Sequence, residues 1–266
     1  MTGAGDGNLR VGKTVSDAFG MVAGNFGKLL VYVLIGGLLT ALATHLFGAV
    51  RFVQNPDGEA TVTFGFHELA GLLLFSVLAL LFGALQSGMM AIFRHALERR
   101  PVSFADSLRG AADNALANGF NTFILWFASG FAALFLLVPA IAFSVIFFVV
   151  KPVAFGRKAG LSNALGISSD LTAGSRWKIL GATALTGVVL LVLVLVGMFI
   201  LLTISNSIVS LGGSGSSAAA VLITVALLMV PVWLAFAVWT SLQMTIHATL
   251  VSLESGQGDS MGEVFD

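Results

Sequence analysis

Long apolar runs constrain this chain more than any other feature. A helix rises 1.5 Å per residue and the hydrocarbon core of a bilayer is about 30 Å thick, so about 20 apolar residues cross it. On this measure the sequence predicts an all-α fold with six transmembrane helices. They cover residues 28–50, 69–93, 119–137, 138–155, 177–204 and 218–247. We expect a single six-span membrane domain over residues 1–252 and an acidic, flexible C-terminal tail over residues 253–266.

The third and fourth spans come from one continuous apolar stretch. Residues 119–155 contain a single internal break, at Pro139. One helix of that length would be about 55 Å long, which far exceeds the hydrocarbon core. We therefore predict two short spans joined by a tight turn.

The composition excludes several classes of function. Hydrophobic residues make up 57% of the chain and charged residues 10%, far from the composition of soluble domains. The 13 Lys and Arg residues balance the 13 Asp and Glu residues, so no overall field attracts nucleic acid and no nucleic-acid partner is expected. The absence of Cys excludes disulfides, thiolate metal sites and thiol catalysis.

The basic residues fall on one side of the predicted membrane. Twelve of the 13 lie before span one, between spans two and three, or between spans four and five, and Arg51 is the exception. Lys and Arg near span ends resist translocation. This asymmetry predicts that both termini are cytoplasmic.

Three cytoplasmic segments share one pattern: a short amphipathic helix, a turn, an aromatic residue and the next span. They are SDAFGMVAGNFGKLL, ADSLRGAADNALANGFNTFIL and SSDLTAGSRWKIL. Thr14 with Asp17, and Ser103 with Asp106, also have capping-box-like spacing. The pattern favours three repeats, with cytoplasmic amphipathic helices before spans one, three and five. The alternative is that polar joints look alike in any multi-span protein.

Basic and aromatic side chains near the span ends are candidate contacts for lipid headgroups. Each base near an anionic leaflet contributes about 1 kcal/mol to binding, although topology alone also explains basic residues at these places. Lys151, followed by Pro152, is expected to snorkel from the end of span four to the surface. The predicted headgroup contacts are Arg99, Arg100, Arg157, Lys158, Arg176, Trp177 and Lys178.

Groups for catalysis are scarce inside the predicted spans. No Asp, Glu, Lys or Arg lies at the middle of any span, so we expect a non-enzymatic protein without a cofactor or a metal site. The nearest polar residues are His45, Gln86, Gln243 and His247. We interpret them as interhelical hydrogen-bond partners or interfacial groups, and the alternative is a role in binding a proton or a substrate.

The segment LLVPAIAFSVIFFVVKPVAFGRKAGLSNALGISSDLTAGSRWKIL carries a family resemblance. It resembles bacterial membrane proteins related to the membrane domain of glycerophosphoryl diester phosphodiesterases, with a Pro-centred turn, a second Pro near the inner end, and a small-residue helix before the next span. The start, SDAFGMVAGNFGKLL, is similar to the N-terminal helix of that family. The positions that match are Pro139, Pro152, Ala164, Leu165, Ser168 or Ser169, Leu171, Gly174 and Trp177.

The resemblance implies a bacterial inner-membrane protein and does not imply phosphodiesterase activity. Six spans leave no room for the separate catalytic barrel, and the His-Arg-Gly type signature is missing because His95 lies between Arg94 and Ala96. The leading hypothesis is a protein that interacts with anionic lipid, or with a membrane-protein partner, through its cytoplasmic amphipathic helices. The alternative is a transporter or a lipid-translocating protein. The sequence does not predict an oligomeric state.

Overall fold

The computed structural model describes residues 9–46, 51–54, 60–63, 68–101, 103–135, 137–157, 160–211 and 218–254. These residues are helical apart from short turns and one antiparallel hairpin. The hairpin pairs β1 (Arg51–Gln54) with β2 (Ala60–Thr63), in the register Arg51 opposite Thr63. The helices are α1 (Val11–Gly24), α2 (Phe26–Leu46), α3 (Glu68–Leu97), α4 (Phe104–Phe135), α5 (Leu137–Ile146), α6 (Val150–Arg157), α7 (Leu161–Thr172), α8 (Arg176–Leu211) and α9 (Ala218–Glu254).

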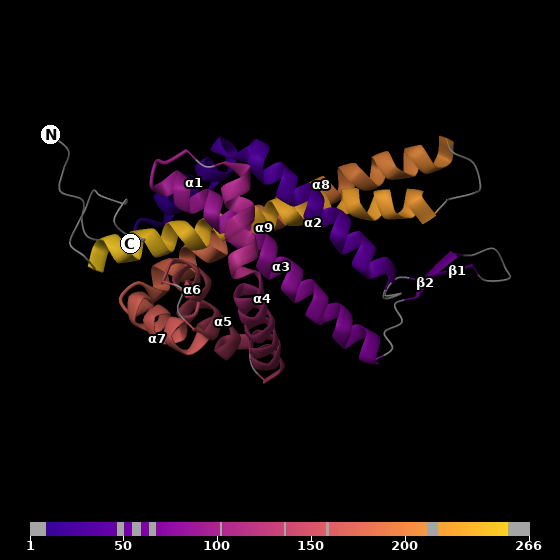
Figure 1. Cartoon of the computed structure of the whole chain (residues 1–266). Helices are drawn as coiled ribbons and strands as arrows, with labels where there is room; N and C mark the ends of the chain where they lie inside the picture. Colours follow the sequence, from indigo (N-terminus) through magenta and orange to yellow (C-terminus); the bar gives the residue numbers. More distant parts are fainter. Residues whose placement is uncertain are drawn as a thin grey trace.

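Four of the six predicted spans coincide with helices that are long and apolar enough to cross a membrane. Their apolar windows are Phe26–Ala43 in α2, Leu73–Leu97 in α3, Arg176–Thr203 in α8 and Ile223–Glu254 in α9. In Figure 1 the hairpin lies at one end of these helices, whereas α1, α6 and α7 lie at the other. These helices indicate a membrane protein. The remaining two spans are not confirmed.

The region predicted as spans three and four folds differently from the expectation. α4 continues unbroken from Phe104, so no separate amphipathic helix precedes residues 119–135. The predicted fourth span is divided into α5, of 10 residues, and α6, of 8 residues. At 1.5 Å per residue α5 is about 15 Å long, half of a hydrocarbon core.

Side chains from other helices satisfy the backbone at the break between α5 and α6. Ser168 and Thr172 of α7 donate hydrogen bonds to the carbonyl oxygen of Ile146, at 2.9 and 3.3 Å. Gln243 of α9 donates from Nε2 to the carbonyl oxygen of Phe148, at 3.1 Å. Helix ends leave carbonyl groups without intrahelical partners, and in apolar surroundings such groups are costly. The break is therefore a stable feature of the packed structure.

Helix α9 joins the two parts of the core. One hydrophobic cluster includes Trp233 and gathers buried residues mainly of α2, α3 and α9, with single residues of α1, α6 and α8. The other includes Val149 and Ile246 and gathers residues of α1, α5, α6, α7, α8 and α9. Trp239 packs against both clusters. Ser241 also ties α1 to α9, because its hydroxyl donates to the carbonyl oxygen of Ala18 at 2.9 Å.

Two helical corners in the structure correspond at a spacing of 150 residues. Helix α1 ends before a break at Asn25 and α2 begins at Phe26, whereas α7 is followed by a turn that ends at Ser175 and α8 begins at Arg176. The buried positions 14, 18, 22 and 29 of the first corner match positions 164, 168, 172 and 179 of the second. The first and third predicted repeats thus share one architecture, and α4 does not have it.

The two expected capping boxes have different outcomes. At the start of α4 the Asp106 backbone N–H donates to Ser103 Oγ at 3.1 Å, and the Ser103 hydroxyl donates to the Asp106 carboxylate. That second hydrogen bond is the main reason that the pKa of Asp106 lies below its ordinary value. The Thr14 prediction is wrong, because Thr14 lies inside α1 and its hydroxyl donates back to the carbonyl oxygen of Arg10, the residue before the helix.

Candidate functional site

A cavity of about 460 Å³ lies among α4, α5, α6, α8 and α9. Its walls are mainly aromatic and aliphatic, and a few polar side chains join them. This volume and this lining are typical of small-molecule sites, which are mostly apolar with a few placed polar groups. The lining residues are Leu125, Trp126, Ile141, Phe143, Ser144, Val145, Phe147, Phe148, Lys151, Leu180, Thr183, Ala184, Trp239 and Gln243.

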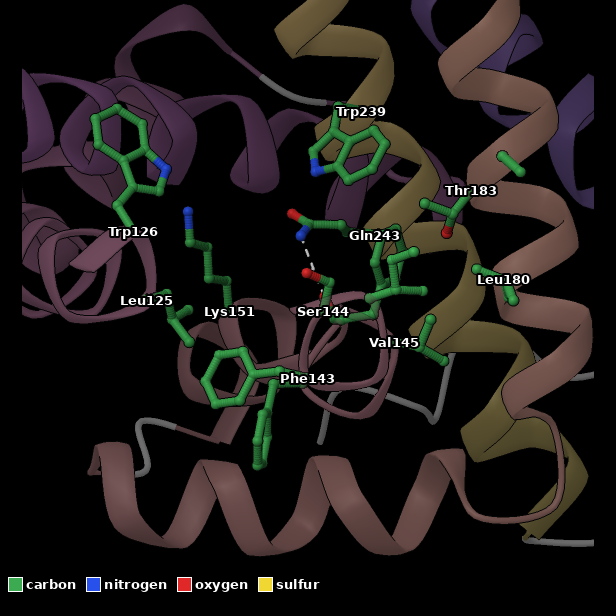
Figure 2. A pocket seen from close by; sticks show the side chains of 14 residues that line it. Leu125, Trp126, Phe143, Ser144, Val145, Lys151, Leu180, Thr183, Trp239 and Gln243 are labelled. Carbon is green, nitrogen blue, oxygen red and sulfur yellow. Dashed lines mark hydrogen bonds between the residues drawn. The ribbon is translucent and has the colours of Figure 1, made fainter. Parts of the chain in front are cut away.

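Lys151 supplies the one charged side chain of this lining. It is only 7% exposed, so the prediction that it snorkels to the surface is wrong. Figure 2 shows its side chain extending between Trp126 on one side and Trp239 with Gln243 on the other. The nitrogen-bearing edges of both indoles turn toward the same space.

A line of hydrogen bonds connects Lys151 to three other helices or turns. Lys151 Nζ donates to Gln86 Oε1 on α3 at 2.7 Å, and Gln86 Nε2 donates to Gln243 Oε1 on α9 at 2.9 Å. Gln243 Nε2 in turn donates to the carbonyl oxygen of Phe148. Gln86 Nε2 also lies 3.4 Å from Thr240 Oγ1. All donors point in one direction along this line, and such chains of hydrogen bonds polarise one another.

The electrostatic balance of this polar cluster is incomplete. Among the described residues no Asp or Glu forms an ion pair with Lys151, and its partner is a neutral amide oxygen. Taking an ammonium out of water without a counter-charge costs several kcal/mol. An ammonium carries three N–H donors, and one of them is used by Gln86. The cluster can therefore accept an anion from the cavity side.

A second cavity of about 390 Å³ adjoins the first at the beginning of α8. Both are lined by Ile141, Val145 and Leu180, while the second also includes Arg176 and Trp177. The two cavities follow each other along α8, because Arg176 lies about one turn before Leu180, and Thr183 lies about one turn after it. The apolar wall thus leads from Trp177, which is 84% exposed, to Lys151.

The structure separates the predicted headgroup contacts into different places. Arg176 and Trp177 lie in the first turn of α8 beside the second cavity, and Lys178 follows them. Arg157 is exposed at the end of α6. Lys158 lies outside the described residues.

Arg99 and Arg100 belong to the turn after α3, and neither lines the Lys151 cavity or the cavity at the beginning of α8. Arg99 has a positive φ of 54°, the left-handed conformation common just after a helix end. Arg100 lies 3.5 Å from Glu98, which also accepts a hydrogen bond from Arg94 at 2.7 Å. Part of the Arg100 charge is therefore compensated within the chain.

The predicted interhelical role of the two glutamines agrees with their contacts, whereas the role of Lys151 differs from the prediction. Gln86 and Gln243 bond to each other across α3 and α9. His247 is buried on α9, and the side chain of His45 lies outside the described part. A signal for the burial of Lys151 is present in the sequence, because apolar residues flank it on both sides in FFVVKPVAF.

Comparison with known proteins identifies no relative. No family model matches the chain, and no curated protein or solved structure gives a significant match. The resemblance of residues 136–180 to the membrane domain of glycerophosphoryl diester phosphodiesterases therefore stays a prediction.

Proposed function

We propose that the chain is a non-enzymatic protein of the bacterial inner membrane that binds anionic lipid in the cavity at Lys151. In this proposal both termini are cytoplasmic, and the corner between α7 and α8 lies at the inner membrane surface. The proposed relationship to the membrane domain of glycerophosphoryl diester phosphodiesterases fits this location.

The observation that carries the proposal is a buried lysine at the wall of an apolar cavity. Lys151 is 7% exposed, and its described partner is the neutral Gln86. An anionic headgroup would offset the cost of burying this charge, and an apolar tail would fill the aromatic and aliphatic walls. The cavity thus matches both ends of an anionic amphiphile.

The exposed basic residues offer a different way to bind the same lipids. Arg176, Trp177 and Lys178 form an interfacial cluster of the kind that attracts an anionic leaflet. Surface attraction of this kind weakens with salt, because exposed charges are screened over about 8–10 Å. Binding at the buried Lys151 is screened much less.

A matched pair of lysine variants separates these two modes. The purified chain in neutral detergent receives oleate, phosphatidylglycerol or zwitterionic phosphatidylcholine, and the midpoint of thermal unfolding is measured. We expect at least one anionic lipid to raise the midpoint, because a ligand at 100 times its Kd stabilises the folded state by about 2.7 kcal/mol. Lys151→Met should abolish the increase, and Lys178→Met should retain it.

Each lysine variant is first checked for a monodisperse elution profile and a cooperative transition without lipid. If Lys178→Met loses the lipid effect and Lys151→Met keeps it, the lipid binds at the surface cluster instead. No effect of either anionic lipid on the original chain would end the proposal.

Transport or lipid translocation is the second candidate. The observation in its favour is the polar line from Lys151 through Gln86 to Gln243, which connects α6, α3 and α9 inside the bundle. Translocation requires that a headgroup crosses from one leaflet to the other. Proteoliposomes with a fluorescent anionic lipid in one leaflet distinguish the candidates, since a binding protein leaves the slow spontaneous exchange unchanged.

A further inference from the structure

The donors around the Lys151 cavity are few and face one space. Besides the Ser144 and Thr183 hydroxyls and the Gln243 amide, they are the ammonium of Lys151, with one of its three N–H groups bound to Gln86, and the indole N–H groups of Trp126 and Trp239. Both indoles are partly buried, and an indole N–H in such surroundings usually finds an acceptor. Such a set can surround one small acceptor group with a single negative charge.

The remainder of the lining limits what that acceptor group can be attached to. Apart from Lys151 and Gln243, the described polar liners are Ser144 and Thr183, and the other ten are aliphatic or aromatic. A phosphodiester with its glycerol and second headgroup would bring several further oxygen atoms into these apolar walls. Polar atoms without partners in such surroundings cost free energy, so a headgroup with only two oxygens is favoured.

The adjoining cavity provides access from the membrane surface. It begins at Arg176 and Trp177 and shares Ile141, Val145 and Leu180 with the Lys151 cavity. A single apolar chain can follow this wall, because its lining between the two ends is aliphatic. The amphiphile can therefore enter from the leaflet beside the α7–α8 corner.

On these grounds we infer that the ligand of the Lys151 cavity is a single-chain carboxylate, a long-chain fatty acid taken from the membrane. Its carboxylate accepts hydrogen bonds from Lys151 and the two indoles, and its alkyl chain lies against the α5 and α8 wall. This inference rests on the proposed function and narrows it to one class of lipid.

Tryptophan fluorescence tests the position of the carboxylate directly. The chain has four Trp residues, of which Trp126 and Trp239 line the cavity and Trp233 is fully buried elsewhere. Trp177→Phe removes the exposed one and keeps an aromatic ring at its place. Fatty acids that carry bromine near the carboxylate or at the methyl end then serve as quenchers of the full chain in neutral detergent.

We expect saturable quenching that is stronger for bromine near the carboxylate. Adding Lys151→Met should raise the half-saturating concentration about tenfold or more, since a hydrogen bond to a charged group accounts for at least that factor. A brominated fatty alcohol of equal length should quench without saturation. Lys178→Met in the same background should leave the saturation curve unchanged.

The possible quenching results distinguish two outcomes: the inference of a carboxylate ligand is wrong, or the proposal of lipid binding as a whole is wrong. Brominated phosphatidylglycerol could quench in a saturable, Lys151-dependent way while the fatty acid does not. That result would overturn the inference of a carboxylate ligand and leave anionic-lipid binding intact. Equal quenching from both bromine positions would overturn the assigned position of the headgroup. If neither lipid quenches in a saturable way, both conclusions fail. Competition by unbrominated oleate, measured on the unmodified chain, checks the result if a variant folds poorly.

Discussion

Gln86 connects the two polar ends of the Lys151 cluster. Its amide oxygen accepts from Lys151 and its amide nitrogen donates to Gln243, so the orientation of the amide is fixed by its partners. With 1% exposure, Gln86 has no access to water that could replace these bonds. One substitution of Gln86 can therefore remove its hydrogen bonds, and another can add a charge beside Lys151.

Two variants of Gln86 should behave differently. Gln86→Leu leaves the buried Lys151 without its described partner, and we expect the free energy of unfolding to fall by about 1–3 kcal/mol. Gln86→Glu supplies a carboxylate next to the ammonium, so the fold should be less affected while binding of an anionic lipid is lost. Unfolding in denaturing detergent measures the first effect and lipid-dependent stabilisation the second. Retention of lipid binding in Gln86→Glu would contradict the role of Lys151.

The sequence predicts individual polar contacts only where the helix bounds are predicted correctly. Gln86 and Gln243 lie in apolar helices whose course follows from hydropathy, and their interhelical bonding agrees with that expectation. Hydropathy puts Lys151 at the end of a straight span, from which a long side chain reaches water. In the structure it lies at the start of a separate short helix, and this changes the direction of its side chain.

At the scale of elements, α3 and α4 approach closely at two glycines. A Cβ at Gly83 would clash with the backbone of Asn118 and Gly119, with the nearest atom at 2.3 Å, and a Cβ at Gly119 would lie 3.0 Å from the Cα of Leu80. Next to this contact Asn118 donates to Ser87 Oγ at 2.6 Å. Small residues allow helix backbones in membranes to approach and pack.

Alanine at Gly83 should therefore separate the two helices. We expect Gly83→Ala to lower the free energy of unfolding by about 1–3 kcal/mol, as overpacking does in well-packed cores. Gly187→Ala on α8 is the matched control, because a Cβ there would meet no neighbouring atom within 4 Å and surface changes are usually within about 0.5 kcal/mol. Unfolding in mixed micelles compares them, and similar losses for both would argue against the close contact.

Hydropathy does not predict the break between α5 and α6. It falls in the run SVIFFVVKPVAF, in which no glycine and no polar cluster marks a turn. The hydroxyls of Ser168 and Thr172 and the amide of Gln243 stabilise the carbonyl groups of this turn from α7 and α9. These partners are distant in sequence, so local pattern cannot reveal them. The hairpin β1–β2 is likewise not predicted by hydropathy.

At the scale of the whole molecule, the helices differ in how much of their surface is buried. Half of the apolar window of α3 is buried, compared with 11% of that of α8. The bare surface of α8 is strongly apolar, including Leu191, Leu195 and Phe199, each more than half exposed. A membrane would cover this surface, whereas water would leave it as a large apolar patch.

The predicted orientation can be tested because the chain has no Cys. Asn163→Cys lies on the exposed side of α7, and Thr61→Cys lies in β2. With both termini in the cytoplasm, a membrane-impermeant maleimide added outside sealed cells should label the second variant and not the first. Permeabilised cells serve as the control for accessibility. Labelling of Asn163→Cys from outside would reverse the topology.

The two corners spaced by 150 residues also define a search pattern for distant relatives. Ala23-Gly24 and Ala173-Gly174 occupy the same places, as do Lys28 and Lys178, and Leu30 and Leu180. One such short motif occurs by chance in many membrane proteins. A pair of them, each at the entry of an apolar helix and separated by the long helices α3 and α4 and the short helices α5 and α6, is far more selective. Genes that encode this pair can be recognised even where the rest of the sequence has diverged.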